Sequence, residues 1–416
     1  MADRRGLLRT ILGGGRVPPP ATPAARGAAP TERATAPAEQ GDRATRTFEA
    51  GRADVSSGLP SGTALLVVTP VSEGFILRGA CCCAQTERLG EVYGKPALSL
   101  AALVAPGGVL PVNVLEFMQT WSRPMTELTL WLNERLRRHG GDLKLVIWDD
   151  SGYQIPWELF WLSNRHGEGE GWLGGLVTVT RWLSIKTAWP EKIRAYSDAH
   201  VCTGPVATFI DEAMGVDHGL FEPYRVEPSA SMHDLARALR SGEAGLSLVY
   251  VACHGEYGAS PRECTLGTMP LVHIDNVNLA RLSGSATFVF LNACHSGALG
   301  YDTDMFNDRV LRGFSEVFLR SGAAGVLATQ GAVGDKLAHQ LAGELLRHLG
   351  EHPGLSVAEA LRAMRAKAAG LAPIDLPDAA GAAVNREILP LLYRFMYVYY
   401  GSPATLISPE LRVGEP

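Results

Sequence analysis

Short uncharged runs of β-branched, aromatic and aliphatic residues recur along the second half of the chain. They lie at residues 206–210, 246–252, 287–291 and 322–330. Apolar runs of this length are typical of strands that are buried on both faces of a parallel sheet. Apolar residues at helical spacing alternate with these runs, at residues 232–239, 304–319, 335–349 and 356–369. The alternation predicts an α/β fold with a mostly parallel sheet flanked by helices.

The first half carries a similar pattern. Strand-like runs occur at residues 64–70, 143–148 and 176–185, and a helical pattern covers 112–138, where Pro124 should divide the helix. All eight tryptophans lie between Trp121 and Trp189, which predicts an aromatic core for this half. We therefore expect an N-terminal α/β subdomain at 61–190 and a second α/β subdomain at 191–416.

The first 60 residues are of a different composition. They are rich in Ala, Arg, Pro, Gly and Thr and show no sustained apolar periodicity. Such a segment cannot bury enough apolar surface to offset the entropy of ordering it. We expect residues 1–60 to form a disordered low-complexity tail.

Two of the strand-like runs end in groups that carry chemistry. The 287–291 run leads to Cys294, and the 246–252 run leads to His254 and Gly255. Carboxyl ends of parallel strands meet at one edge of a sheet, where α/β proteins place their ligands. An imidazole beside a cysteine lowers the pKa of the thiol and can protonate a leaving group. The backbone N–H groups of Gly255 and Cys294 could stabilise an oxyanion.

The residues around these two positions resemble a known family. YVACHGEYG at 250–258 and FLNACHSG at 290–297 are similar to the motifs of caspase-like cysteine peptidases, and most of all to the CHAT domain, which is related to separase. PWELF at 156–160 and YYGSP at 399–403 are also similar to elements of that family.

The resemblance implies a caspase-like fold whose N-terminal half is a degenerate copy. It implies a cysteine endopeptidase with a His254–Cys294 dyad that needs no metal or organic cofactor. A protein substrate, a regulatory protein partner and a role in bacterial stress or antiviral defence are expected by analogy with the family.

The residue after which the substrate is cleaved is harder to predict. Cleavage after a basic residue requires a carboxylate in the first substrate pocket. Metacaspases have an Asp two residues before the nucleophile, where this chain has Asn292. Asp335 matches the Asp of a Trp-x-x-x-Asp element in CHAT and separase sequences, although Gly331 takes the Trp position. We predict Asp335 as the pocket acid, with Asp211 as a second candidate and a helix cap as the alternative role of Asp335.

Other cysteines and histidines compete less well for the catalytic role. Cys253 alternates to the opposite side from His254 and should point into the fold. His295 adjoins the nucleophile in sequence, and a contact with substrate or solvent is expected for it. Cys81, Cys82 and Cys83 should point to alternating faces of an extended strand, so we expect apolar filler and no metal site.

Composition limits the remaining choices. A net charge of −5 and a pI near 6.1 give no reason to expect nucleic acid as a partner. No segment reaches the ~18 uninterrupted apolar residues of a membrane helix, so we expect no membrane contact. Seven cysteines, an odd number, favour a reducing, cytoplasmic compartment. Two other functions stay open: a degenerate CHAT domain that acts as a protein-interaction scaffold, and a thiol amidase for a small substrate.

Overall fold

The computed structural model describes residues 59–98, 100, 111–163, 169–185, 199–240, 245–258, 260–284, 286–301, 311–371 and 382–412. All of them belong to one structural unit, Phe48–Pro416. Almost all of the expected N-terminal tail lies outside the described residues.

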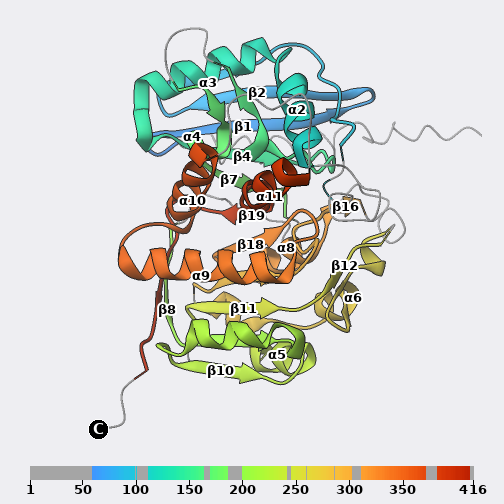
Figure 1. The fold of residues 1–416 in the computed structure, drawn as a ribbon, viewed down its shortest axis with the longest axis vertical. Helices are drawn as coiled ribbons and strands as arrows, with labels where there is room; N and C mark the ends of the chain where they lie inside the picture. The colour runs from blue at the N-terminus through green and yellow to red at the C-terminus, as the bar shows by residue number, and fades with distance from the viewer. Residues whose placement is uncertain are drawn as a thin grey trace, which may run out of the picture. The chain divides into compact units, whose positions relative to one another are not determined.

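An eleven-stranded sheet runs through both halves of the chain (Figure 1). In spatial order its strands are β10 (Val226–Ser229), β9 (Val206–Ile210), β11 (Leu248–Ala252), β15 (Phe288–Asn292), β18 (Gly325–Thr329), β19 (Tyr397–Gly401), β7 (Thr178–Trp182), β4 (Lys144–Asp149), β1 (Thr63–Val71), β2 (Gly74–Cys81) and β3 (Ala84–Arg88).

The sheet is mostly parallel. Antiparallel pairing is confined to β18–β19 and to β1–β2–β3. Strand β19, from the end of the chain, lies between β18 and β7 and thereby joins the two halves in one sheet (Figure 1). The predicted mostly parallel α/β fold is confirmed.

The described residues also form smaller sheets of two or three strands. They are formed by β12 (Gly255–Glu256), β13 (Thr265–Leu266) and β14 (Met269–Pro270); by β16 (Gly300–Tyr301) and β17 (Leu311–Arg312); by β20 (Leu406–Pro409) and β8 (Val201–Gly204); and by β5 (Trp161–Leu162) and β6 (Gly171–Trp172).

Helices cover both faces of the sheet. The α-helices are α2 (Pro111–Ser122), α3 (Thr126–His139), α4 (Leu173–Leu176), α5 (Met232–Arg240), α6 (Leu271–Asp275), α7 (Ala280–Gly284), α8 (Phe314–Arg320), α9 (Asp335–Glu351), α10 (Val357–Leu371) and α11 (Ala382–Met396). The 3₁₀ helices are η2 (Gly140–Asp142), η3 (Trp157–Leu159), η4 (Glu212–Phe221) and η5 (Pro261–Glu263).

Alternate residues of the central strands enter two separate cores, as the two-residue period of a strand requires. Tyr250 and Phe290 pack in one core with α2, α9, α10 and α11. Val249 and Leu291 pack in the other core with α5, α6, α7 and α8. Because both faces are covered, these strands carry apolar residues at nearly every position, which is the pattern that made them predictable.

The expected helices agree with the structure except at 304–319, and the short helices α4, α6 and α7 were not predicted. Pro124 separates α2 from α3, as predicted. Of the helix expected at 304–319, residues 304–310 lie outside the described part of the chain, Leu311–Arg312 form the extended β17, and helix α8 begins at Phe314. Helix α11 was not predicted, since Pro390 interrupts its pattern.

The N-terminal half has the aromatic core that its tryptophans predicted. The ring of Phe75 contacts the rings of Trp121 and Trp157, with centroids 6.4 and 5.9 Å apart. Trp121 also lies edge-on to Phe160, at 6.5 Å. Trp157 and Phe160 are fully buried.

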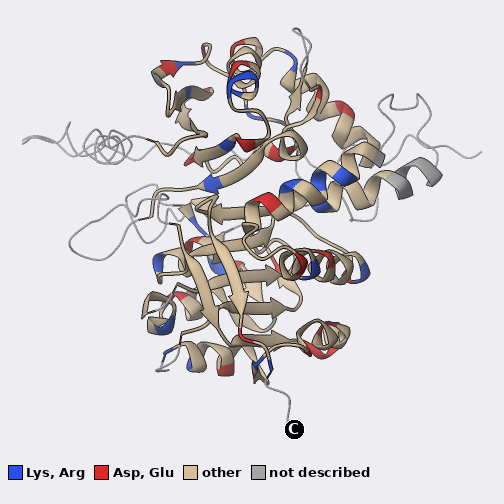
Figure 2. Cartoon of the chain, turned by 90° about the vertical axis from the view of Figure 1, so that its left-hand side faces the viewer, with Lys and Arg blue, Asp and Glu red and all other residues tan. Residues whose placement is uncertain are grey.

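The PWELF element holds a buried ion pair. Acidic and basic residues lie mainly on helices and loops (Figure 2), and few of them lie in the central strands of the main sheet. Arg181 of β7 is an exception: its guanidinium donates two hydrogen bonds to the carboxylate of Glu158 in η3, the one from Nε at 3.0 Å. Both side chains are almost completely buried. The guanidinium of Arg365 is also buried, and burial lowers its pKa to about 10.

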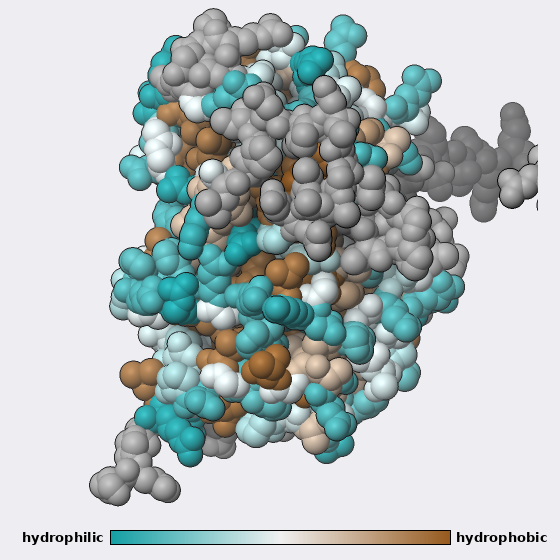
Figure 3. Space-filling view, viewed as in Figure 1, coloured by the Kyte–Doolittle hydropathy of each residue, from teal (hydrophilic) through white to brown (hydrophobic). Residues whose placement is uncertain are grey.

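Hydrophobic side chains form small separate patches among hydrophilic ones on the face shown in Figure 3. Among the described residues, none of the helices combines the length and the apolar character that crossing a bilayer requires.

The expectation for Cys81, Cys82 and Cys83 is wrong in its geometry. Strand β2 ends at Cys81, which pairs with Ala84 at the start of β3. Cys82 and Cys83 form the turn between the two strands, so the alternation of an extended strand does not apply to them. All three sulfurs lie on one side, beside His139.

We expect Glu158→Gln to lower the free energy of unfolding by about 3–5 kcal/mol, because it leaves the Arg181 cation buried without a counter-charge. Urea denaturation measures the change. Glu351→Gln is the control: Glu351 pairs with Arg347 on the exposed surface of α9, where such a pair contributes about 0–1 kcal/mol. Equal effects of the two substitutions would contradict the assigned role of the buried pair.

Candidate functional site

The pairing of β11 with β15 places the two predicted catalytic residues at one edge. The strands are parallel, and their register runs from Leu248 opposite Phe288 to Ala252 opposite Asn292. His254 and Cys294 each follow two residues after the last pair. Both follow the carboxyl ends of their strands, the edge at which open α/β sheets bind ligands.

Gly255 lies against the backbone of Cys294. A Cβ atom at position 255 would come within 2.1 Å of the Cys294 carbonyl oxygen and 3.3 Å of its nitrogen. No side chain fits at such a distance, so the chain after His254 can pass here only as glycine. The two segments that the sequence singled out are therefore in direct backbone contact.

The sulfur of Cys294 is half-buried and lies next to a third segment. The backbone N–H of Val333 donates to Sγ at 3.4 Å, and the Val333 carbonyl oxygen lies 3.6 Å from Sγ. His254 is exposed to solvent. Among the interactions of the described residues, no hydrogen bond joins Cys294 directly to His254.

The chain reverses direction directly after the thiol. His295 has a φ of 57°, in the left-handed region that residues other than Gly seldom adopt. Its N–H donates to the carbonyl of Gly331 at 3.1 Å, and the N–H of Gly297 donates to that of Thr329 at 2.7 Å. Thr329 Oγ1 donates in turn to the carbonyl of Ala293, at 2.6 Å. These bonds tie the Cys294 turn to the end of β18.

A buried polar chain lies beneath this turn. Asn292 donates from Nδ2 to the hydroxyl of Tyr250 and accepts from the hydroxyl of Tyr397. Tyr250 donates to the carboxylate of Asp217, which also binds Nδ1 of His339 on α9. Asn292 is only 6% exposed and Asp217 only 2%.

Both phenols of this chain stay protonated. Burial, followed by the charge of Asp217, raises the pKa of Tyr250 well above its usual value. Burial, followed by charge on Cys294, does the same for the pKa of Tyr397. Sequence reasoning missed Asp217, Tyr250, His339 and Tyr397, because the tyrosines read as ordinary strand residues and nothing in the sequence pairs Asp217 with His339.

The two predicted pocket acids occupy different places. Asp335 is exposed and is the first residue of α9, two residues after Val333, and the N-cap position of the helix is taken by Gly334. The carboxylate of Asp211 accepts the N–H of Ala213 at 3.1 Å, which makes Asp211 the N-cap of η4. At position 331, a Cβ would come within 2.4 Å of the Met396 side chain and 2.8 Å of the Leu100 carbonyl. This crowding explains why Gly stands where the family has Trp.

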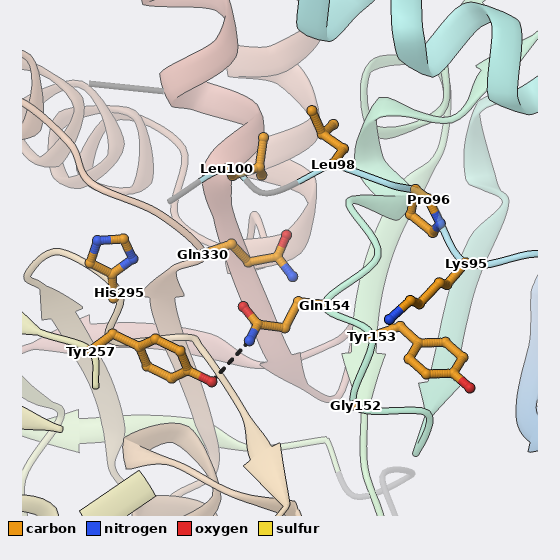
Figure 4. A pocket seen from close by; sticks show the side chains of 10 residues that line it. All are labelled: Lys95, Pro96, Leu98, Leu100, Gly152, Tyr153, Gln154, Tyr257, His295 and Gln330. Carbon is orange, nitrogen blue, oxygen red and sulfur yellow. Dashed lines mark hydrogen bonds between the residues drawn. The ribbon is translucent and has the colours of Figure 1, made fainter. Parts of the chain in front are cut away.

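A cavity of about 260 Å³ opens beside the Cys294 turn (Figure 4). His295 and Tyr257 line one side, with ring centroids 6.2 Å apart, and Lys95 and Tyr153 line the other. Gln154 donates to the hydroxyl of Tyr257 at 3.1 Å across it. Burial lowers the pKa of His295. The expected contact of His295 with solvent or substrate fits this position.

Cys253 and Cys202 differ from Cys294 in their surroundings. Both are fully buried, and burial raises the pKa of each thiol to about 12. They therefore remain uncharged near neutral pH, and an uncharged thiol is a poor nucleophile. The expectation that Cys253 points into the fold is confirmed.

A thiol and an imidazole at adjacent strand ends, with glycine backbone against the thiol residue, are the features of a caspase-like site. The profile of the CHAT domain matches residues 123–379, more than half of the chain. The chain therefore belongs to the CHAT domain family, as the strand-end motifs predicted. No curated protein matches it.

Two solved structures of the Saccharomyces cerevisiae separase–securin complex contain chains with similarity to this one. The match to the 2.6 Å structure has 16% sequence identity and a TM-score of 0.38, and the match to the 3.0 Å structure has 14% and 0.36. Each covers 67% of this chain and 17% of the other chain, so the likeness spans less than a fifth of the length of those chains.

We expect Gly255→Ala to destabilise the protein by about 1–3 kcal/mol or more, because the obstacle is the rigid backbone of Cys294. The same shift should reduce the reactivity of the Cys294 thiol. Thermal unfolding and alkylation of Cys294 measure the two effects. Gly284→Ala is the matched control, since an added Cβ there meets no atom within 4 Å. A Gly255→Ala protein with unchanged stability would show that the close approach is absent in solution.

Proposed function

We propose that the protein is a cysteine endopeptidase that cleaves a protein substrate with a Cys294–His254 dyad. The observation that carries the proposal is the parallel pairing of β11 and β15, whose last pair, Ala252 and Asn292, comes two residues before His254 and Cys294. The contact of Gly255 with the Cys294 backbone supports it. The proposal requires the exposed imidazole of His254 to turn toward the thiol of Cys294.

In the proposed reaction the Cys294 thiolate attacks the scissile carbonyl carbon, and a C–S bond forms. The C–N bond then breaks, and the departing amine takes a proton from His254. A water molecule, deprotonated by His254, hydrolyses the thioester and regenerates the thiol. The N–H of Val333 donates to the sulfur, and the Val333 carbonyl oxygen lies 3.6 Å from it, so the Val333 backbone holds the sulfur in place.

The backbone N–H groups of Gly255 and Cys294 would hold the oxyanion. In the antiparallel pair of β12 and β13, Gly267 N–H donates to the carbonyl of His254 at 2.7 Å. In that pattern the N–H of Gly255 points away from the partner strand, because the hydrogen-bonding positions of an antiparallel ladder alternate. The group is thus directed to where a bound carbonyl would lie.

The substrate peptide would lie along the carboxyl edge of the sheet. Asp335, close to Val333 in sequence and exposed, is our proposed acid for a basic residue before the cleaved bond, with Asp211 as the second candidate. Asn292 would support the substrate site from the buried side, because its amide nitrogen donates to Tyr250 and its amide oxygen accepts from Tyr397. A regulatory protein partner and a reducing, cytoplasmic compartment are consistent with a thiol nucleophile and complete the proposal.

An activity-based thiol probe tests the dyad. We expect labelling at Cys294, its loss in Cys294→Ala, and a drop of at least about 100-fold in His254→Ala, because a general acid–base contributes about 10²–10⁴-fold. Peptide mapping by mass spectrometry measures the labelled position. Cys253 is the internal control, since its pKa of about 12 keeps it as the thiol.

Other outcomes separate the alternative functions. An inert Cys294 in the presence of a bound protein partner would favour an interaction scaffold. A labelled Cys294 that turns over small amides but no peptide in a library would favour a thiol amidase.

A peptide library also tests the pocket acid. We expect Asp335→Asn to reduce cleavage after Arg or Lys roughly 10- to 100-fold, the value of a hydrogen bond between charged groups, and to leave cleavage after Leu unchanged. Glu351→Gln, at the far end of the same helix, is the control. Loss of the preference in Asp211→Asn instead would transfer the role to Asp211. Cleavage after Leu or Met with none after Arg would show that neither Asp335 nor Asp211 is a pocket acid.

A further inference from the structure

Four potential metal ligands converge in the N-terminal half, far along the sheet order from Cys294. They are the Sγ atoms of Cys81, Cys82 and Cys83 and the Nε2 atom of His139, all within 4.8 Å of one another. Cys81 Sγ lies 3.7 Å from that of Cys82 and 3.2 Å from that of Cys83. His139 Nε2 lies 3.5, 3.9 and 3.8 Å from the three sulfurs in chain order.

Two elements bring these ligands together. The three cysteines come from the end of β2 and the turn that leads into β3, where the pairing register shifts between Gly79 and Cys81. His139 is the last residue of α3, so its ring projects from the helix end toward the turn. The ligands are therefore held by two different segments, which a bound ion would join.

The distances agree with a tetrahedral ion. Zinc binds sulfur at about 2.3 Å and nitrogen at about 2.0–2.1 Å, which places neighbouring ligands of a tetrahedron about 3.5–3.8 Å apart. The five ligand separations given above fall between 3.2 and 3.9 Å. Three thiolates and one imidazole also form one of the standard zinc sets, Cys₃His.

A buried guanidinium adjoins the cluster. Three thiolates and a divalent ion leave a net charge of −1. Arg135, almost fully buried on α3, donates from its guanidinium to Cys83 Sγ at 3.4 Å. The same guanidinium also pairs with the carboxylates of Glu134 at 3.1 Å and Glu87 at 3.8 Å, so it offsets that charge only in part.

We propose that Cys81, Cys82, Cys83 and His139 bind one zinc ion in a closed structural site. Soft thiolate ligands with imidazole select zinc over the hard divalent cations. With four protein ligands, no position remains for water or substrate, so the ion does no chemistry. It joins the β2–β3 hairpin, which forms one edge of the main sheet, to the C-terminal end of α3.

The test uses the full chain, purified after expression in medium with added zinc. We expect one zinc ion per chain by mass spectrometry of metal content. After removal of zinc under reducing conditions, Co²⁺ should produce the visible absorption of a tetrahedral cobalt–thiolate site. Bound zinc should raise the Tm and protect Cys82 and Cys83 from alkylation.

Variants locate the ion. Cys82→Ser and His139→Asn should each lose the zinc and the cobalt spectrum, and a chelator should no longer lower their Tm. Cys264→Ser, which removes a thiol outside the cluster, should retain the ion. A wild-type chain that binds neither Zn²⁺ nor Co²⁺, or a Cys82→Ser/His139→Asn chain that keeps full zinc, would overturn the proposal. The zinc content and cobalt spectrum of the wild-type chain test the proposal by themselves, so it can still be tested if a variant fails to fold.

Discussion

The parallel pairing of β11 with β15 is the constraint on which the candidate site depends. Five consecutive backbone pairs fix the register, and a shift by one residue would turn every side chain of one strand to the other face. His254 and Cys294 lie just beyond the last pair, so their proximity follows from the sheet. Gly255 completes the arrangement, because any larger residue would force the two strand ends apart.

Beneath this edge the structure is polar as well as buried. Asn292, Tyr250 and Asp217 satisfy one another's hydrogen bonds, and His339 and Tyr397 end the chain on α9 and β19. Buried polar groups stabilise a unique arrangement only when each has a partner. The network therefore fixes the end of β15, the strand that leads to Cys294.

The two halves of the chain share one continuous sheet. Strand β19 closes the sheet between β18 and β7, and the Glu158–Arg181 pair lies at this junction, within reach of Gln330 at the end of β18. Gln330 in turn lines the cavity beside the Cys294 turn. The N-terminal half thus contacts the surroundings of the candidate site through buried side chains. These contacts link it to the half that carries His254 and Cys294.

Local pattern alone determined the central strands, the division of α2 from α3 at Pro124, and the strand-end positions of His254 and Cys294. Those features depend on periodicity and on proline geometry, which are properties of neighbouring residues. Only the tertiary structure decided the polar chain from Asn292 to His339 and the convergence of Cys81, Cys82 and Cys83 on His139. These groups are distant in sequence, or lie in a turn where strand alternation fails, and they meet only because the packed sheet and helices bring them together.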